Sequence, residues 1–296
     1  MQVLVTGGAG FIGTNLIKRL LGDGYKVECL DNYSTGKREN ELEGCKYIEV
    51  DISDSLRRHK GFGLETYQLQ KPDIIYHLAA IPRIQPSFLE PTKTFDSNVK
   101  ATQNIMEYAR TLNIPVVYAG SSSSHGDKYA NPYTHSKWLG EEVVTMYNKI
   151  YDVPTAICRF YNVYGEYQLT EGAYCTVLGI FERLYNNNEP LTITGDGEQR
   201  RDFTHVDDIV DGLIKCAKSL YMSETIGETF ELGRGKNYSV NEIASAFGDY
   251  PIEYIDNRPG EMRNTLNTDT KALDVLGWKP KNDIINYIEV TYEIQK

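Results

Sequence analysis

The feature that most constrains the fold is a glycine-rich turn near the start of the chain, TGGAGFIG, residues 6–13. It follows the apolar run QVLV and opens an amphipathic segment, so it joins a buried strand to a helix. Gly7, Gly10 and Gly13 let the backbone turn tightly and approach a pyrophosphate, whose charge is held at the helix N-terminus. A tight strand-to-helix turn that binds no ligand is the alternative interpretation.

Two acids beyond this turn bear on the ligand. Asp31 ends the second apolar run, where a carboxylate accepts hydrogen bonds from a ribose and repels a 2′-phosphate. Asp31 therefore favours NAD over NADP. Asp51 ends the third apolar run and is equally consistent with a contact to the adenine edge and with an ordinary acid at a strand end.

Short apolar runs alternate with longer helical patterns through the first half of the chain. Strands that are buried on both faces read as continuous apolar runs, and their alternation with helices is typical of successive βα units. The sequence therefore predicts an α/β protein with a Rossmann-type, doubly wound parallel sheet. Helices are expected over about 95–113 and 133–151.

The pattern changes after about Tyr164, where the elements become shorter and glycine-rich breaks appear. We expect a nucleotide-binding domain over 1–163 and a smaller α/β lobe over 164–296. The apolar helical segment at about 206–220 is expected to return from the second lobe and pack on the sheet.

The bulk composition excludes several classes of function. The formal net charge of −10 argues against nucleic-acid and membrane-surface partners, because both need a broad positive field. The five cysteines are scattered and lack C-x-x-C spacing, which argues against a disulfide framework and a zinc site. The chain starts directly with an apolar strand and contains no apolar run of membrane length. A cytoplasmic, reducing compartment is expected.

Seven stretches carry a resemblance to a known family: TGGAGFIG, DNYSTG at 31–36, HLAA at 77–80, the serines at 121–124, Tyr133-x-x-x-Lys137, RFYNVYG at 159–165 and GDGEQRRDFTHVDD at 195–208. Together they resemble the extended short-chain dehydrogenase/reductase family. Within it, the chain looks most like the NAD-dependent nucleotide-sugar epimerases and dehydratases, and above all the UDP-sugar 4-epimerases. The resemblance runs nearly end to end.

This resemblance gives the segment from the serines to Lys137 a chemical role. Oxidising a sugar hydroxyl requires a base for its proton, and a free tyrosine with a pKa of about 10 is about 3 units too weakly acidic at pH 7, roughly 4 kcal/mol. Lys137, one helical turn from Tyr133, supplies a positive charge that favours the phenolate. The resemblance implies that Tyr133 is the base and that a serine hydroxyl forms a hydrogen bond with the reacting oxygen. It also implies that Lys137 lowers the pKa of Tyr133 and binds the ribose of the cofactor. An exposed surface pair is the alternative.

Counting back from Gly126, which matches a glycine of the family, assigns the catalytic serine to Ser121, with its neighbours left open. Ser122 and Ser123 are then expected to contact the sugar. His125 stands where the family usually has a tyrosine, and the stretch from Gly126 to Tyr133 is shorter than usual. His125 is expected to be packed or hydrogen-bonded rather than catalytic.

The same run bears on the reaction. Dehydratases of the family typically carry a threonine followed by Asp-Glu at this place, to handle the C5 proton and the C6 hydroxyl. This chain has serines instead, which disfavours a dehydratase, although an acid from elsewhere in the chain is left open.

The resemblance extends the cofactor site to further positions of the matching motifs. These positions are Phe11, Ile12, Asn32, Ser34, Thr35, Gly36, Ile52, Leu78, Ala79 and Ala80, beside the three glycines, Asp31, Asp51, Tyr133 and Lys137. No metal is expected.

On the substrate side, Arg201 and Arg258 match the arginines that hold the diphosphate in the family. The planar guanidinium group of arginine can donate two parallel hydrogen bonds to phosphate oxygens. Asn162 matches an asparagine of the family that contacts the diphosphate or the sugar. Ala173 and Val177 lie where members of the family bind uracil through backbone groups. Exposed surface arginines and a turn-forming asparagine are the alternatives.

Three further positions lie near these motifs: Thr265, His205 and Asp207. Thr265 falls near the sugar pocket, where a small side chain leaves room for an N-acetyl group. His205 and Asp207 are expected to be structural, because an acid near a helix start is more often a cap than a catalyst.

The resemblance implies reversible, NAD-dependent inversion at C4 of a UDP-sugar through a 4-keto intermediate. Other outcomes of the same ketone, such as decarboxylation of a UDP-hexuronate or formation of a deoxysugar, are the alternative, and a non-catalytic NAD-binding sensor is the hypothesis from another class. The resemblance also implies a homodimer that pairs through the helices at about 95–113 and 134–150.

Overall fold

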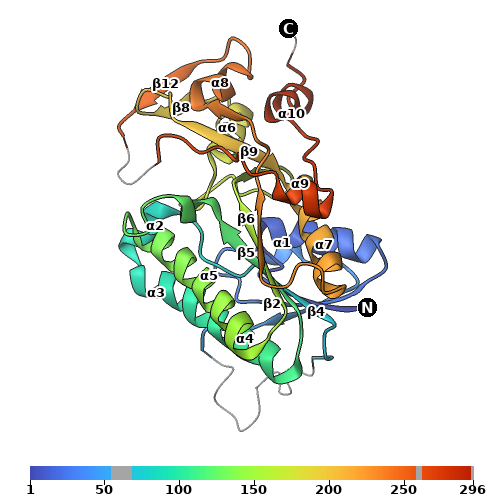
Figure 1. Cartoon of the computed structure of the whole chain (residues 1–296). Coiled ribbons are helices and arrows are strands. Elements are labelled where there is room, and N and C mark those ends of the chain that lie inside the picture. Colours follow the sequence, from blue (N-terminus) through green and yellow to red (C-terminus); the bar gives the residue numbers. More distant parts are fainter. Residues whose placement is uncertain (55–68, 258–261, 295–296) are drawn as a thin grey trace.

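The computed structural model of the 296-residue chain describes residues 1–54, 69–257 and 262–294. A seven-stranded sheet forms the larger lobe, in the order β10-β6-β5-β4-β1-β2-β3, and each neighbouring pair is parallel. Its strands are β1 (Gln2–Thr6), β2 (Lys26–Asp31), β3 (Cys45–Glu49), β4 (Ile74–His77), β5 (Val116–Ser121), β6 (Thr155–Phe160) and β10 (Glu228–Leu232). The strand order reverses direction beside β1, as in doubly wound folds. The predicted Rossmann-type sheet is confirmed (Figure 1).

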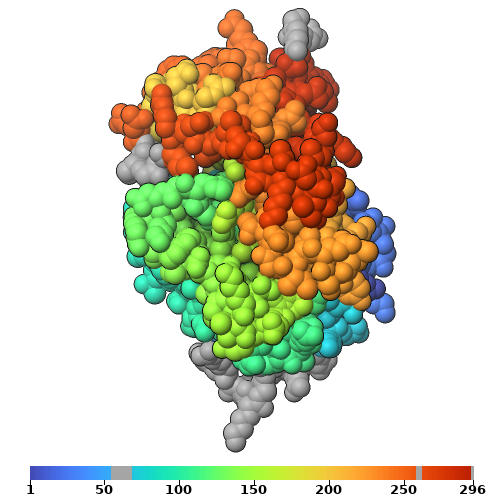
Figure 2. Space-filling view, viewed as in Figure 1, coloured from blue at the N-terminus to red at the C-terminus, as the bar shows by residue number. Residues whose placement is uncertain are grey.

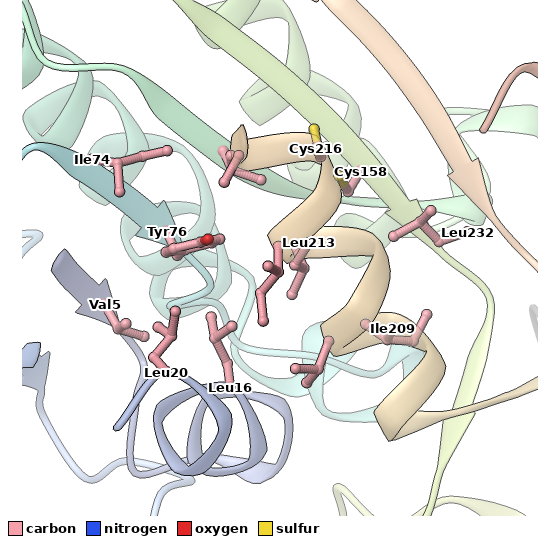
Figure 3. Close-up of a cluster of buried hydrophobic side chains, with 14 of the residues drawn as sticks. Val5, Leu16, Leu20, Ile74, Tyr76, Cys158, Ile209, Leu213, Cys216 and Leu232 are labelled. Carbon is pink, nitrogen blue, oxygen red and sulfur yellow. The ribbon is translucent and has the colours of Figure 1, made fainter. Parts of the chain in front are cut away.

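Helices cover both faces of this sheet. On one face α1 (Phe11–Gly22) packs against α7 (Val206–Tyr221), which is the helix expected at about 206–220. On the other face α4 (Ala101–Leu112) packs against α5 (Pro132–Tyr151) (Figure 1). Figure 3 shows the first interface, in which apolar side chains of α1, α7 and the strands meet: Val5, Leu16, Leu20, Ile74, Tyr76, Ile209, Leu213 and Leu232. Fully burying one such side chain stabilises the fold by about 1.5–3 kcal/mol.

Both helices predicted on either side of the serines are present, and one of them is interrupted by a π-helical turn. The segment expected as one helix over 95–113 contains α3 (Pro91–Phe95), a π-helical turn η3 (Asp96–Lys100) and α4. Helix α5 begins at Pro132, after Asn131 accepts a hydrogen bond from the backbone N–H of Thr134 at 2.8 Å. This start is favourable because an asparagine cap satisfies a free N–H and proline suits the first helical position.

The smaller lobe has its own sheets and core. Strands β7 (Asn162–Tyr164), β9 (Arg200–His205) and β11 (Asn237–Ser239) form one sheet, and β8 (Leu191–Thr194) pairs in parallel with β12 (Ile252–Ile255). Helices pack on these strands around an apolar cluster: α6 (Val177–Asn186), α8 (Val240–Ser245) and α10 (Ile284–Thr291). The space-filling view shows this lobe seated on the larger one (Figure 2).

One strand of the large sheet comes from the second half of the chain. Strand β10 pairs in parallel with β6 at the edge of the sheet, and α9 (Lys271–Leu276) packs against β10 and α7. The sequence did not single out this strand. Its position matters for the site, because it brings Glu231 next to β6.

The remaining short elements are η1 (Arg38–Asn40), α2 (Ile84–Leu89) and the 3₁₀ turn η4 (Ser122–His125). Among the helices that the structure describes, none has both the length and the apolar character needed to cross a bilayer.

Candidate active site

A cavity of about 820 Å³ opens where the carboxyl ends of the sheet strands face the smaller lobe. This edge of the sheet, beside the reversal in strand order, is where doubly wound folds bind ligands. The predicted site residues that line it are Gly7, Gly10, Phe11, Ile12, Gly13, Asp31, Asn32, Ser34, Thr35, Asp51, Ile52, Leu78, Ala79, Ala80, Ser121, Ser122, Ser123, Tyr133, Lys137, Asn162, Ala173, Val177 and Arg201. Gly36 is not among the lining residues, and Arg258 lies outside the described residues.

The glycine turn is shaped by close backbone contacts. A Cβ atom on Gly13 would lie 2.2 Å from the carbonyl oxygen of Gly7, and Gly7 itself has a φ of +73°. A Cβ atom on Gly36 would lie 2.9 Å from the backbone of Ala9, so this glycine lets its loop approach the turn from behind. The residue types at these positions are therefore dictated by space and by backbone conformation.

The first turn of α1 is open toward the cavity. No side chain caps this N-terminus, and residues 10–13 line the cavity. Backbone N–H groups at a helix N-terminus, together with the helix dipole, attract phosphate. The turn and the helix start therefore fit the pyrophosphate of a dinucleotide.

Asp31 and Asp51 line the same end of the cavity. The Asp31 carboxylate accepts hydrogen bonds from the backbone N–H groups of Ala9 at 2.9 Å and Tyr33 at 2.8 Å, and burial raises its pKa against the effect of these bonds. Burial acts to raise the pKa of Asp51 as well, but hydrogen bonds from Ser53 and Asn32 outweigh it and lower the pKa. Both side chains are thereby held in fixed positions at the strand ends.

Ser121 and Tyr133 meet in the middle of the cavity. Ser121 ends β5, Tyr133 lies in the first turn of α5, and their hydroxyl oxygens are 3.4 Å apart. The Ser121 hydroxyl also lies 2.9 Å from the hydroxyl of Ser123 and accepts a hydrogen bond from its backbone N–H at 3.2 Å. The structure thus brings two of the three predicted catalytic residues into hydrogen-bond reach.

Lys137 lies one turn further along α5 and is buried. Its ammonium donates hydrogen bonds to the carbonyl of Ala119 at 2.6 Å and to the hydroxyl of Tyr118 at 3.3 Å. Burial lowers its pKa to about 8, while the Glu141 carboxylate acts to raise it.

Arg83 is a cation that the sequence did not single out. It lines the cavity, and its Nε donates a hydrogen bond to the carbonyl of Tyr174 at 3.0 Å. Burial raises the pKa of Tyr133, whereas the Ser121 hydrogen bond and the Arg83 charge act to lower it. Arg83 has a φ of +87°, a strained conformation for a residue with a side chain, and such strain often occurs at functional sites. No feature of the sequence signals this conformation.

The smaller lobe contributes the far wall. The Asn162 amide lies 3.5 Å from the Thr265 hydroxyl, and both residues line the cavity with Arg201. Ala173 and Val177 line it from the segment that leads into α6. His205 caps α7, since its ring accepts a hydrogen bond from the backbone N–H of Asp207 at 3.2 Å.

The acidic side chains of the described cavity wall lie at one end of the cavity. Among the described residues that line the cavity, the acidic side chains are Asp31 and Asp51, both at the glycine-turn end. In the described part of the chain, no group of three or more His, Cys, Asp or Glu side chains could hold a metal ion.

Comparisons with known proteins agree with this geometry. The model of the NAD dependent epimerase/dehydratase family matches residues 3–233, and the chain belongs to this family. It is therefore an enzyme of the nucleotide-sugar epimerase/dehydratase class, and its cofactor is NAD.

Individual relatives extend the similarity over nearly the whole chain. A putative UDP-glucose 4-epimerase of Methanocaldococcus jannaschii is 32% identical over 96% of this chain and 94% of its own length. The crystal structure of a Thermotoga maritima UDP-glucose 4-epimerase with UDP-glucose matches 99% of this chain and 98% of its own, with a TM-score of 0.89 and 28% identity. A Bacillus cereus UDP-glucuronic acid 4-epimerase, solved with UDP-glucuronic acid and NAD, matches 99% and 98% with a TM-score of 0.85 and 27% identity.

Proposed function

We propose that the protein catalyses reversible inversion at C4 of a UDP-sugar through a transient 4-keto sugar. The observation that carries this proposal is the approach of the Ser121 and Tyr133 hydroxyls to 3.4 Å, inside a cavity that also contains the glycine turn and Arg201. A base, a hydrogen-bonding hydroxyl and a dinucleotide site are the groups that alcohol oxidation requires.

Tyr133 acts as the base that removes the proton of the sugar 4-hydroxyl and later returns it. Its phenolate has to form in a buried place, where burial alone opposes the charge. The Ser121 hydroxyl and the Arg83 guanidinium offset part of this cost. Ser121 also orients the reacting oxygen, and protonated Lys137 anchors the ribose of the cofactor beside Tyr133.

NAD, when bound, would supply the acceptor and donor of the hydride at C4. The chain holds it with the N–H groups of the α1 start, with Asp31 at a ribose, and with Asp51 near the adenine. Because the cofactor is regenerated in every cycle, we expect the purified protein to retain it.

The smaller lobe holds the nucleotide while the sugar turns. Arg201 binds the diphosphate, and Asn162 contacts the diphosphate or the sugar. Ala173 and Val177 border the uracil, and Ser122 and Ser123 contact the sugar near the reacting carbon. Arg258 is proposed as a second diphosphate ligand from the sequence alone, since it lies outside the described residues.

The lining of the cavity favours inversion over elimination of water. Elimination needs an acid near Tyr133, whereas the described lining residues have carboxylates only at Asp31 and Asp51, at the cofactor end. Decarboxylation of a UDP-hexuronate shares the same ketone and is an outcome that the experiment below separates from inversion.

The test uses the purified protein with its retained NAD and no added reductant. UDP-glucose, UDP-N-acetylglucosamine and UDP-glucuronate are incubated separately, and the anomeric protons are followed by NMR. The expected result is the 4-epimer in at least one tube. Release of CO₂ with formation of a pentose would assign a decarboxylase, and three unchanged sugars would contradict the proposal for these substrates.

We further propose that the protein works as a homodimer through α4 and α5. These neighbouring helices cover one face of the sheet, and apolar side chains near the end of α5 are exposed to solvent: Met146, Ile150 and Tyr151. Exposed apolar groups clustered on one face are typical of an interface. Sedimentation equilibrium should give twice the chain mass, and Ile150→Glu should shift it toward the monomer.

A further inference from the structure

A cluster of three charged side chains, two buried carboxylates and one half-buried arginine, lies beside the serine turn η4. Arg159 of β6 donates hydrogen bonds to Glu141 of α5, from Nη2 at 2.7 Å and from Nε at 3.0 Å. The same guanidinium donates to Glu231 of β10 from Nη1 at 3.0 Å. One arginine thus joins two carboxylates from two different elements.

Glu141 contacts the residue that precedes the serine turn and the third residue of the turn. Its Oε1 accepts a hydrogen bond from the backbone N–H of Ser121 at 3.2 Å and one from the hydroxyl of Ser124 at 3.0 Å. Space for this carboxylate depends on Gly120, where a Cβ atom would lie 2.8 Å from Oε1. The carboxylate therefore fixes the backbone of the proposed catalytic serine.

Glu231 contacts the end of the same turn. Its Oε1 lies 2.9 Å from Nε2 of His125, and its Oε2 accepts a hydrogen bond from the hydroxyl of Tyr161 at 3.2 Å. His125 is the residue that stands in place of the usual tyrosine of the family. Both ends of the turn are thus tied to the cluster, one through Glu141 and one through Glu231.

The burial of the cluster makes a purely stabilising role a poor explanation. Glu141 is 3% exposed and Glu231 is 6% exposed, and removing a carboxylate from water is costly unless it is paired. A buried ion pair is often no more stable than well-packed apolar side chains of similar volume. The hydrogen bonds of such an ion pair, by contrast, have fixed directions and can hold a turn in one conformation.

We propose that Glu141, Arg159 and Glu231 are positioning residues that hold the serine turn at both ends and keep the Ser121 hydroxyl in reach of Tyr133. None of the three lines the cavity, so they act through Ser121 and not on the substrate. The inference rests on the proposed function, in which Ser121 orients the reacting oxygen.

The first test compares Glu141→Gln with Glu142→Gln, a matched change at the next, exposed residue of the same helix. Glutamine keeps the size and an acceptor oxygen but loses the charge that faces Arg159. Because a misplacement of about 1 Å in a reacting group can cost about 100-fold, we expect kcat to fall by about 10- to 100-fold. KM should stay unchanged. A kcat equal to that of Glu142→Gln would overturn the proposal.

The second test asks whether the loss passes through Ser121. In a Ser121→Ala background, Glu141→Gln should lower kcat much less than it does in the wild type, because residues that act as one unit are not additive. An equal loss in both backgrounds would show that Glu141 acts by another route and would overturn the inference.

Glu231→Gln provides a second variant in case Glu141→Gln does not fold, since its change lies further from Ser121. Crystal structures of either variant with NAD should show the Ser121 hydroxyl beyond hydrogen-bond distance from Tyr133. A Ser121 that stays at the wild-type distance would overturn the inference, even for a protein whose sugar substrate is unknown.

The outcomes separate this inference from the proposed function. If Ser121→Ala and Tyr133→Phe both keep full turnover, the proposed chemistry fails. If both lose turnover while Glu141→Gln and Glu231→Gln keep it, only the role of the cluster fails.

Discussion

The two ends of the cavity are built in different ways. At the cofactor end, the wall consists mainly of backbone and small residues at the ends of regular strands, such as Gly7 after β1 and Ala79 after β4. At the opposite end, the proposed sugar end, the wall consists of side chains from separate elements, such as Arg83 before α2, Arg201 on β9 and Thr265 in a loop.

The two ends should therefore tolerate different kinds of substitution. Recognition by backbone at the cofactor end depends on space, so added volume should do the most damage there. Recognition by side chains at the sugar end depends on charge and hydrogen bonds, so changes that preserve size but remove a polar atom should do the most damage there.

The largest effect is expected at the middle of the cavity, from Tyr133→Phe. This change removes one oxygen and no volume, and general acid–base catalysis contributes about 10²- to 10⁴-fold. We expect turnover to fall by about that factor while the protein still purifies with NAD. Tyr129→Phe, an exposed tyrosine of the same segment, is the control. Full activity of Tyr133→Phe would place the base elsewhere.

The next effect is expected at the cofactor end, from Gly13→Ala. A Cβ atom there would lie 2.2 Å from the Gly7 carbonyl, and such overpacking costs about 1–3 kcal/mol, or about 5- to 150-fold in affinity. We expect NAD affinity, measured by calorimetry on the apoprotein, to fall by this factor. Gly22→Ala, with open space around the added methyl group, is the control. Equal affinities would break the proposed contrast between the two ends.

A smaller effect is expected from the charge of Arg83. The guanidinium acts to lower the pKa of Tyr133, so its loss in Arg83→Met should raise that pKa. Because the proposed base is the phenolate, the rising limb of the kcat–pH profile should move to higher pH, and activity at pH 7 should fall. Arg83→Lys keeps a positive charge and the same backbone requirement, so its profile should move less. Superimposable profiles for all three proteins would exclude this influence of Arg83.

The smallest effect is expected where the lobes touch at the surface. Lys18 of α1 pairs with Glu166 at 2.8 Å, and both side chains are more than half exposed. Exposed ion pairs contribute about 0–1 kcal/mol, so Glu166→Gln should lower the free energy of unfolding by at most about 1 kcal/mol. Urea unfolding measures this change. A larger loss would show that the two lobes are coupled through their surface more strongly than this pair predicts.

The two ends of the cavity also differ in how well the sequence predicted them. Gly7, Gly13 and Asp31 follow from local rules, because a turn between a buried strand and a helix leaves few alternatives for the residue types. The strand β10 was not predicted, because a short run such as ETFEL carries no sign of which sheet it joins. Its position depends on contacts between distant parts of the chain.

The cluster of Glu141, Arg159 and Glu231 could not be predicted from the sequence either. Glu141 lies one helical turn beyond Lys137, but the sequence alone does not show which groups its carboxylate contacts. Arg159 and Glu231 lie on neighbouring strands that are far apart in the chain. Such a cluster becomes visible only when the strand pairing is known.

The central claim is that C4 inverts by transient oxidation at this site. The most direct measurement uses the three UDP-sugars of the NMR assay, each carrying deuterium at C4, in ordinary water. We expect a 4-epimer that retains the deuterium at C4, because the same hydride is returned within one active site. A 4-epimer with a solvent proton at C4, or no 4-epimer from any of the three sugars, would contradict it.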